Sequence, residues 1–307
     1  MDTNLILVLL VNGLVWGTLL ALLALGLSLT FGLTEVMNLA HGEFYMWGAV
    51  AGYFVIQITG SFWVAVPVVF LLGATTGLVV ERVLLRNQNH QVANTLILTF
   101  GLAMVMQHLA HMLFGGAPRR IAAPELLSGT FSLFGVGYST YRVFVAMFAA
   151  TILISAWAVV HRTSFGAAVR VVRENPELAS SRYGIPVWLV YWVTFGVGSG
   201  VAALAGLLAA PIVAVDVHMG TEILPLAFMA VIVGGFGDMK GPVLAAIAIG
   251  LSEGLLTCVV SPIFARVATL GGVAILLLVW PQGIGDPLEH LLLNAKRSSL
   301  RSVGNRE

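Results

Sequence analysis

Charged residues are scarce in this sequence: Asp, Glu, Lys and Arg make up only 9% of its 307 residues, whereas 59% are apolar. Soluble globular domains carry roughly 25% charged residues, so this chain has too little polar surface to cover the two water-facing domains that its length would allow. A net charge of +1 also leaves no basic surface for nucleic acid. These shortages indicate a polytopic protein embedded in a lipid bilayer.

Cysteine and lysine are scarce as well. The single cysteine, Cys258, excludes an internal disulfide and a cysteine-based metal cluster. Neither lysine, Lys240 or Lys296, follows a glycine, so the phosphate loop of ATP-hydrolysing enzymes is missing, as are nucleophile-elbow and zinc-protease motifs. His108 and His111 share a helix face and could bind a metal, but histidines inside a bundle more often form hydrogen bonds. We therefore expect no enzyme, no cofactor and no metal site.

Apolar stretches recur at the length a helix needs to cross a bilayer, about 20 residues. The stretch 226–236 is only half a crossing, and polar residues interrupt 36–58. We predict an all-α, polytopic membrane helix bundle with about 8–9 transmembrane segments, broken or half helices included, in one domain over residues 1–307. The predicted segments are 5–33, 36–58, 62–80, 95–114, 143–160, 187–215, 226–236, 243–260 and 263–280.

Basic residues predict which ends of these segments are cytoplasmic, because short loops rich in Arg and Lys stay inside. The connection 161–186 holds four arginines and the tail 281–307 holds four basic residues, so both are expected in the cytoplasm. The N-terminus has no nearby basic residue and is expected in the periplasm. Four arginines depart from this assignment because they fall on its outer side: Arg119, Arg120, Arg142 and Arg266.

Glycines recur four residues apart within the apolar stretches, which aligns two glycines on one helix face. Helices in lipid associate mainly where small residues let their backbones approach, so such pairs favour a tightly packed bundle. The pairs are Gly13 and Gly17, Gly48 and Gly52, Gly73 and Gly77, Gly196 and Gly200, and Gly250 and Gly254.

A polar hexapeptide interrupts the second apolar stretch: Asn38-Leu39-Ala40-His41-Gly42-Glu43. An ionised carboxylate in the middle of a bilayer costs roughly 2.5 to 3.5 kcal/mol, so Glu43 should face a cavity or a partner. Gly42 permits the backbone to break, and a half-helix starting here would place Glu43 in its first turn, where the helix dipole favours an anion. Two interpretations stand side by side: a buried cap of a broken helix, or one wall of a solute pathway.

The connection 161–186, which we call the elbow, is far longer than the usual loop of about 4 to 6 residues. Ser164 can cap a short helix that runs to Glu174. Asn175 can cap a second helix, with Pro176 in its first position and Gly184 at its end. The elbow is therefore predicted to contain two short helices that meet at a bend.

An apolar strip of Ala168, Val171 and Val172 runs along the first elbow helix beside charged residues. This makeup favours a protein-docking surface over a solvated connecting loop. The candidate docking residues are Arg170, Arg173, Glu174, Asn175, Pro176 and Glu177.

A glycine-rich segment, residues 234–242, resembles a phosphate loop only superficially, because no strand precedes it, and it predicts a break at the inner face. Glu253 follows it on a face with Gly250 and Gly254, where a buried hydrogen bond between helices is favoured over a proton carrier, since no basic partner is obvious nearby. The candidate pathway residues are Asn38, His41, Gly42, Glu43, Gln107 and Glu253.

At these residues the chain closely resembles the permease subunits of bacterial ABC importers for branched-chain amino acids. The resemblance implies that this permease domain pairs with a homologous second permease, and that each permease docks a separate ATPase subunit through elbow residues 167–181. It also implies a periplasmic solute-binding protein that delivers the solute. The matching stretches are 32–48, Glu81-Arg82-Val83, 166–184 with Glu174-Asn175-Pro176, 234–242, and Pro281-Gln282-Gly283.

The function that the resemblance implies is ATP-driven import of leucine, isoleucine and valine across the bacterial inner membrane, by a subunit that is not itself catalytic. Similar permeases also serve urea and short amides. A stand-alone channel or proton-coupled carrier, with Glu43, His41 and Glu253 as relay groups, is the competing class, and a purely structural membrane subunit is a third possibility.

Overall fold

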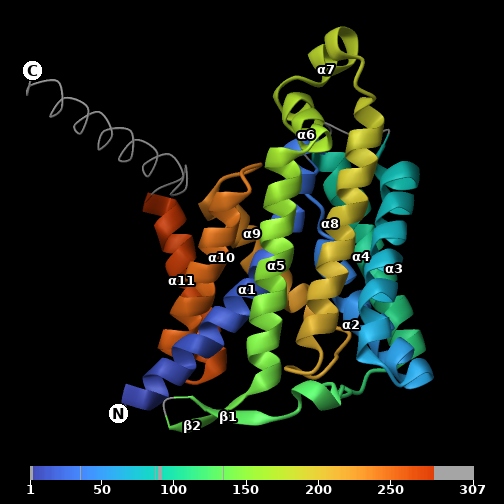
Figure 1. Cartoon of the computed structure of the whole chain (residues 1–307). Helices are drawn as coiled ribbons and strands as arrows, with labels where there is room; N and C mark the ends of the chain where they lie inside the picture. Colours follow the sequence, from blue (N-terminus) through green and yellow to red (C-terminus); the bar gives the residue numbers. More distant parts are fainter. Residues whose placement is uncertain (1–2, 35, 87, 89–91, 134, 280–307) are drawn as a thin grey trace, which may run out of the picture.

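The computed structural model describes residues 3–34, 36–86, 88, 92–133 and 135–279 (Figure 1). The predicted stop at Pro281, the motif Pro281-Gln282-Gly283 and the tail 281–307 lie outside these residues. The described elements are α1 (Thr3–Thr34), α2 (His41–Thr59), α3 (Phe62–Val80), the π-helix η1 (Glu81–Leu85), α4 (Val92–Phe114), the 3-10 helix η2 (Glu125–Leu127), β1 (Thr130–Leu133), β2 (Val136–Ser139), α5 (Thr140–Arg162), α6 (Ser164–Glu174), α7 (Pro176–Tyr183), α8 (Val187–Ala209), α9 (Met219–Gly234), α10 (Lys240–Leu256) and α11 (Pro262–Val279).

Six of the described helices are long and apolar enough to cross a membrane: α1, α3 continued by η1, α4, α5, α8 and α11. Helices α2, α9 and α10, with 19, 16 and 17 residues, complete the bundle. The predicted all-α, polytopic membrane bundle is therefore confirmed.

Three predicted segments have one end that differs from the structure by five residues or more. The seventh begins at Met219 instead of residue 226. The second does not begin at residue 36, because residues 36–40 are not helical and α2 starts at His41. The sixth does not reach residue 215, because α8 ends at Ala209, two residues before Pro211. A proline disfavours helical geometry in the residue before it, which accounts for the early end of α8.

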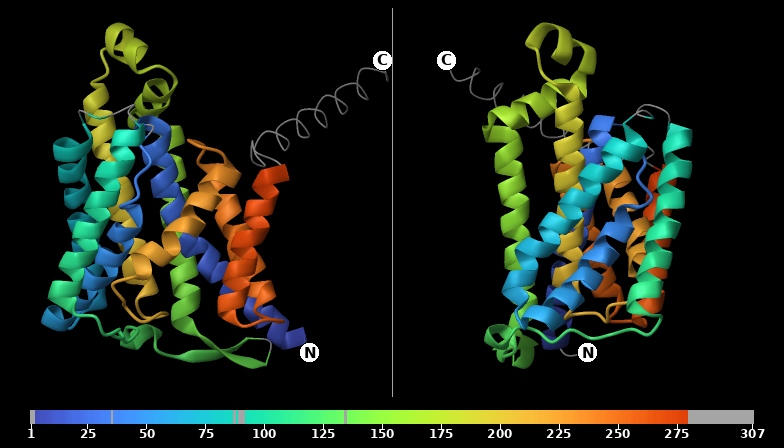
Figure 2. Two further views of the ribbon diagram at one scale, coloured as in Figure 1. Left: turned by 180° about the vertical axis from the view of Figure 1, so that it is seen from behind. Right: turned by 90° about the vertical axis from the view of Figure 1, so that its right-hand side faces the viewer.

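Helices α1 and α8 form the centre of the bundle. Helix α8 has 83% of its most apolar window buried, whereas α5 and α11 have only 11% of theirs buried. Helix α1 packs along α10, and α8 packs against α2 and α3 on the other side, as the two views in Figure 2 show. The peripheral helices therefore present most of their apolar side chains to the surroundings, as expected for a bundle in lipid.

The five glycine pairs all lie where helices touch, which confirms the packing prediction. At each glycine an added Cβ atom would meet the neighbouring helix, and in half of the cases the nearest atom belongs to its backbone. The α1 pair faces the α10 pair, so Gly13 and Gly17 oppose Gly250 and Gly254; the α2 pair (Gly48, Gly52) faces Ala203 and Leu207 of α8; the α3 pair (Gly73, Gly77) faces the α8 stretch that contains Gly196 and Gly200.

The two ends of the bundle differ (Figure 1). At one end, which we call the elbow end, α6 and α7 project beyond the other helices. At the opposite, hairpin end, β1 and β2 pair as an antiparallel hairpin that sequence analysis did not predict. Tyr138 of β2 and Arg142 of α5 both donate hydrogen bonds to Asn12 Oδ1 of α1, at 3.0 and 2.6 Å. These bonds attach the hairpin to the first helix.

The α1–α10 contact makes a direct prediction. Gly250→Ala places a methyl group against the Gly17 backbone, so it should lower the free energy of unfolding by about 1 to 3 kcal/mol, the usual effect of overpacking. Gly271→Ala is the matched control, because a Cβ atom at Gly271 of α11 meets nothing within 4 Å. Thermal unfolding of the purified proteins in detergent measures both; equal melting temperatures would contradict the proposed packing.

Candidate functional site

The segment before α2 is buried inside the bundle although it is not helical. Asn38 is 0% exposed, and its Oδ1 accepts a hydrogen bond from the Ala40 amide at 3.0 Å. Thr99 Oγ1 of α4 accepts a hydrogen bond from the Leu39 amide at 3.2 Å and donates one to the Met37 carbonyl at 3.1 Å. Unpaired backbone groups are costly in a membrane, so these side chains make the broken backbone tolerable there.

The first turn of α2 holds the predicted acidic residue. Glu43 lies in this turn and is 1% exposed, and the helix dipole at this end of α2 favours its negative charge. The His41 ring is fully buried against Gly26 of α1. This placement favours a packing role for His41 over contact with a solute. For Glu43 both interpretations remain open: a buried cap of a broken helix, or part of the wall of a solute pathway.

The first turn of α9 contacts the first turn of α2. A Cβ atom on Gly42 would meet the Gly220 carbonyl, and one on Gly220 would meet the Gly42 carbonyl. Glu43 Oε2 lies 3.1 Å from the position of that added Cβ atom on Gly220. The first turns of α2 and α9 thus touch backbone to backbone, and we call this contact the half-helix junction.

The two helices leave the half-helix junction towards opposite ends of the bundle. Tyr53, late in α2, accepts a hydrogen bond from Arg119 beside the hairpin end at 3.2 Å. The loop after α9 instead contacts Arg173 of α6, at the elbow end. In Figure 2 the segment before α2 descends from the elbow end and α2 starts part-way along the bundle. The half-helix junction therefore lies within the bundle, away from both ends.

Helix α4 contacts the segments that lead into both half-helices. Thr99, seven residues after Val92, bonds the segment before α2. Gln107, seven residues before Phe114, has its Nε2 2.9 Å from His218 Nδ1, in the segment before α9. The two positions are eight residues apart, about 12 Å along the helix axis. Gln107 thus lies near the other predicted pathway residues, as one support of α9.

The half-helix junction keeps unused hydrogen-bonding capacity. Asn38 Nδ2, Glu43 Oε2 and both ring nitrogens of His41 are buried and have no hydrogen-bond partner among the described residues. On α2, Phe44 and Trp47 line an apolar cavity of about 340 Å³ together with residues of α3, α4 and α8. Phe44 follows Glu43 in the chain, but Asn38, Glu43 and the residues of α9 are not among those that line the cavity. The half-helix junction itself offers a carboxylate, an amide and the starts of two helices, which suits recognition of the polar part of a small molecule.

Glu253 has a basic partner, contrary to the expectation from sequence. Arg266 Nε of α11 donates a hydrogen bond to Glu253 Oε1 at 3.3 Å, and Arg266 also lies 3.6 Å from Glu222 Oε2 in the first turn of α9. The Arg266 guanidinium lies over the Trp16 ring of α1, 5.7 Å from its centroid. Glu253 is thus part of an ion-pair cluster that joins α9, α10 and α11, which favours the structural role.

The elbow folds as its capping signals predict. Helix α6 spans Ser164–Glu174 and α7 spans Pro176–Tyr183. Asn175 Oδ1 accepts a hydrogen bond from the Leu178 amide at 2.8 Å, and Gly184 ends α7 with a φ of 62°. One detail is corrected: the cap of α6 is Thr163, whose hydroxyl accepts from the Gly166 amide at 3.1 Å, and Ser164 is the first helical residue.

The apolar strip of α6 packs within the chain, so the docking prediction depends on the charged residues beside it. Val172 is 1% exposed and packs in a small apolar cluster with Leu33 of α1, Ala179 of α7 and Val190 of α8; Ala168 and Val171 pack against this cluster. Two predicted docking arginines also bond their own chain, because Arg170 donates to the Val160 carbonyl and Arg173 to the Gly237 carbonyl. Glu174, Asn175 and Glu177 are exposed at the bend, and Pro176 is half-buried.

Sequence analysis missed several residues of these sites. Gly220, Thr99 and Arg266 act through contacts with segments far along the chain, and no local motif marks them. The available signals were weak: a glycine beside a half-length apolar stretch, and an arginine near the outer end of the last segment.

A helical bundle with half-helices that start inside it, next to unpartnered polar groups, defines a polytopic membrane transport protein. The chain belongs to the family described as branched-chain amino acid transport system / permease component, which matches residues 9–279.

Named relatives agree with this family. The high-affinity branched-chain amino acid transport system permease protein LivH of Escherichia coli (strain K12) is 29% identical over 297 residues, covering 89% of this chain and 93% of LivH. A probable LivH of Methanocaldococcus jannaschii is 30% identical, covering 89% and 90%. The chain is also similar to the LivM permease protein of Escherichia coli (strain K12), at 26% identity over 86% of this chain and 67% of LivM.

The ion-pair cluster predicts an asymmetric response to substitution. Arg266→Gln leaves Glu253 buried without its partner, so it should lower the melting temperature of the purified protein by several degrees. Glu253→Gln in the same chain should restore part of the loss, because it removes the unpaired carboxylate.

Glu222→Gln is the matched control, since the Glu222 side chain is 65% exposed and an exposed pair contributes only about 0 to 1 kcal/mol. If the double variant melted lower than Arg266→Gln alone, Glu253 would not depend on Arg266.

Proposed function

We propose that this chain is the transmembrane permease subunit of an ATP-driven importer, and that it carries leucine, isoleucine and valine across the bacterial inner membrane. Membership of the permease family over residues 9–279 carries the proposal. The proteins named LivH are branched-chain amino acid permeases, and this chain is similar to them over nearly their whole length. The apolar cavity lined by Phe44 and Trp47 of α2 fits a solute with an apolar side chain.

Energy for transport comes from partners in this proposal. The sequence has no phosphate loop, so two separate ATPase subunits would hydrolyse ATP. A second, homologous permease would complete the channel, in line with the similarity of this chain to both LivH and LivM. A periplasmic solute-binding protein would deliver the solute at the hairpin end.

The elbow end is the cytoplasmic end in this proposal, which places the N-terminus in the periplasm and the tail 281–307 in the cytoplasm. Arg119 and Arg142, which departed from the charge rule, are engaged by the protein itself. The Arg119 guanidinium lies over the rings of Tyr53 and Phe114, at 5.3 and 4.8 Å from their centroids, and Arg142 bonds Asn12. Their placement therefore follows from packing rather than from a cytoplasmic location.

The solute pathway passes the half-helix junction. Asn38, Gly42, Glu43 and Gln107 are its proposed contacts. The packing of the His41 ring on α1 and the bond between Glu253 and Arg266 favour structural roles for these two residues. This arrangement also weighs against a proton-coupled carrier, because Glu253 is held by Arg266 and the His41 ring packs on α1. Urea or a short amide stays the alternative solute.

Uptake of labelled leucine tests the function. A strain without this protein should regain ATP-dependent leucine uptake when complemented with the wild-type chain. Glu43→Gln and Asn38→Ala should each reduce uptake about tenfold, the effect of one lost hydrogen bond of about 1.4 kcal/mol. Gln57→Ala, at an exposed position of the same helix α2, should have no effect.

Three results would contradict parts of the proposal. Uptake of urea in place of leucine would identify the alternative solute. Uptake that follows a proton gradient and ignores ATP would indicate a carrier. Full leucine uptake by both Glu43→Gln and Asn38→Ala would indicate that the solute pathway does not pass the start of α2.

Copurification tests the docking surface. Helix α7 projects furthest from the bundle (Figure 1), and Glu177 and Leu178 are exposed on it. Glu177→Arg should reduce the amount of ATPase subunit that copurifies with the permease by about tenfold, because reversing a charge in an interface places like charges together. Glu125→Arg, an exposed reversal at the hairpin end, is the control, and equal recovery from both variants would exclude α7 as the docking element.

A further inference from the structure

The loop between α9 and α10, residues 235–239, is held between two other elements. On one side, Ser28 of α1 donates a hydrogen bond to the Asp238 carbonyl at 2.7 Å. Phe31 of α1 packs on Phe236 with ring centroids 4.4 Å apart. The backbone of Gly237 also touches Gly32 closely. On this side the loop is fixed to the elbow end of α1.

Arg173 of α6 holds the loop from the other side. Its guanidinium lies against Gly237 and donates a hydrogen bond to the Gly237 carbonyl. Gly237 has a φ of 77°, a conformation that side chains rarely adopt, and a Cβ atom there would lie 2.9 Å from the Arg173 guanidinium carbon. The loop conformation and the position of Arg173 therefore depend on each other.

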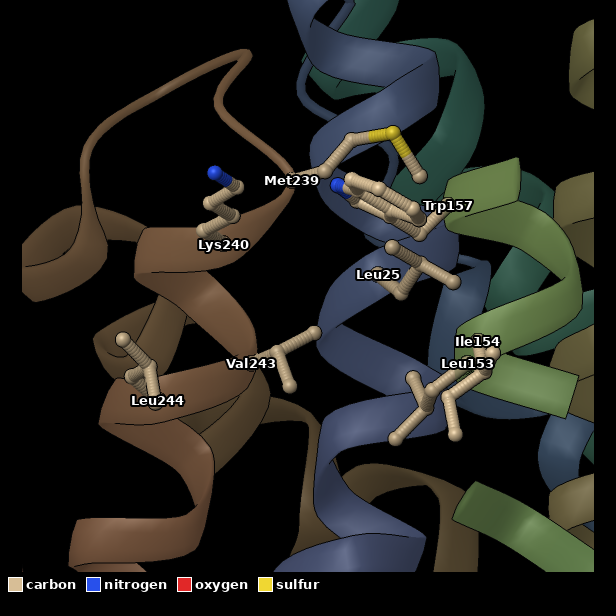
Figure 3. Close-up of a pocket in the computed structure, with 8 residues that line it drawn as sticks. All are labelled: Leu25, Leu153, Ile154, Trp157, Met239, Lys240, Val243 and Leu244. Atoms are coloured by element: carbon tan, nitrogen blue, oxygen red, sulfur yellow. The ribbon is translucent and has the colours of Figure 1, made fainter. Parts of the chain in front are cut away.

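The loop is also firmly joined to the helices on both of its ends. The Asp238 carboxylate accepts hydrogen bonds from the amides of Met239, Lys240 and Gly241, at 2.7, 3.3 and 3.1 Å, which caps α10. Figure 3 shows the Met239 side chain reaching towards Trp157 of α5, above Leu25, at the end of an apolar groove of about 320 Å³. A displacement of the loop must therefore move the start of α10 and the end of α9.

Helix α9 connects this loop to the half-helix junction. It has 16 residues, about 24 Å of helix, with its last residue next to the loop and Gly220 in contact with Gly42. Helix α6 is itself anchored by Val169 and Val172 in the apolar cluster with Leu33. A movement of the elbow thus has a continuous packed route to the junction: α6, Arg173, Gly237, α9.

We propose that Arg173 is a positioning residue that transmits movement of the elbow to the half-helix junction, through its hydrogen bond to the Gly237 carbonyl, instead of a residue that contacts the ATPase. The inference rests on the proposed function, because the movement it transmits would come from a docked ATPase. It assigns the two helices of the elbow different tasks. Helix α7 docks the ATPase, and Arg173 of α6 connects the docked element to the pathway.

The two lysines of the chain allow the opening of this loop to be measured by proteolysis. Lys240, exposed at the start of α10, and Lys296 are the only lysines in the chain, so a lysine-specific protease can cut at just two places. Cleavage after Lys240 requires the end of the loop to open, so its rate measures the opening, and cleavage after Lys296 serves as the internal reference.

The experiment uses the purified complex of both permeases with the ATPase subunits, with and without a non-hydrolysable ATP analogue. In the wild type, the analogue should change the cleavage rate at Lys240 by at least about threefold. Arg173→Gln should raise the rate without nucleotide about tenfold and abolish the effect of the analogue, while ATPase subunits still copurify in full. Arg173→Lys should restore part of the effect, because its ammonium can donate to the same carbonyl.

Arg86→Gln is the matched control, since the Arg86 guanidinium lies over the Trp188 ring, 5.3 Å from its centroid, and its loss should leave cleavage at Lys240 unchanged. Loss of the ATPase subunits from Arg173→Gln would overturn the proposal and make Arg173 a docking residue. A wild-type cleavage rate that ignores the analogue would overturn it too. Failure of the wild type to transport leucine would instead contradict the proposed solute, and the nucleotide effect at Lys240 would still decide the role of Arg173.

Discussion

The contact between Gly42 and Gly220 is the constraint on which the rest of the structure depends. Two helices begin inside the bundle, and each leaves backbone N–H groups without partners in its own helix. Side chains supply hydrogen bonds to the segments that lead into these helices. Asn38 and Thr99 accept hydrogen bonds from backbone amides before α2, and Gln107 contacts His218 in the segment before α9. Only glycine lets the two first turns approach this closely, so the place where Glu43 meets α9 follows from the absence of two side chains.

Close backbone packing extends from this contact through the centre of the bundle. Helix α8 packs on α2 and α3, and α1 packs on α10, through glycines that leave no room for a Cβ atom. Since lipid provides little hydrophobic drive between helices, this fit and the few polar bonds must hold the bundle together. The centre is therefore tightly interlocked, and movement is expected to pass along whole helices such as α9 rather than through side-chain rearrangement.

The scarce charges have internal partners more often than their positions in the sequence suggest. Arg266 binds Glu253 and Glu222, Arg142 binds Asn12, and Arg173 binds the Gly237 carbonyl. The charge rule treats every arginine near a membrane surface as a marker of the cytoplasmic side. In this protein three of its four exceptions, Arg119, Arg142 and Arg266, are structural arginines, which explains why counting charges alone left them unaccounted for.

Local signals in the sequence determined the helical class, the start of a half-helix near Glu43, and the bounds of α6 and α7. Apolar length, capping residues and a left-handed glycine act within a few residues of the chain, so they can be recognised without a fold. The candidate site was only half predictable: Asn38, Gly42, Glu43 and Gln107 lie at or beside the junction, but the inward turn of the α6 strip and the partners Gly220, Arg266 and Gly237 came from tertiary structure alone. Those partners are set by how whole helices cross and pack, and the pairing of Arg173 with Gly237, 64 residues away, has no local trace in the sequence.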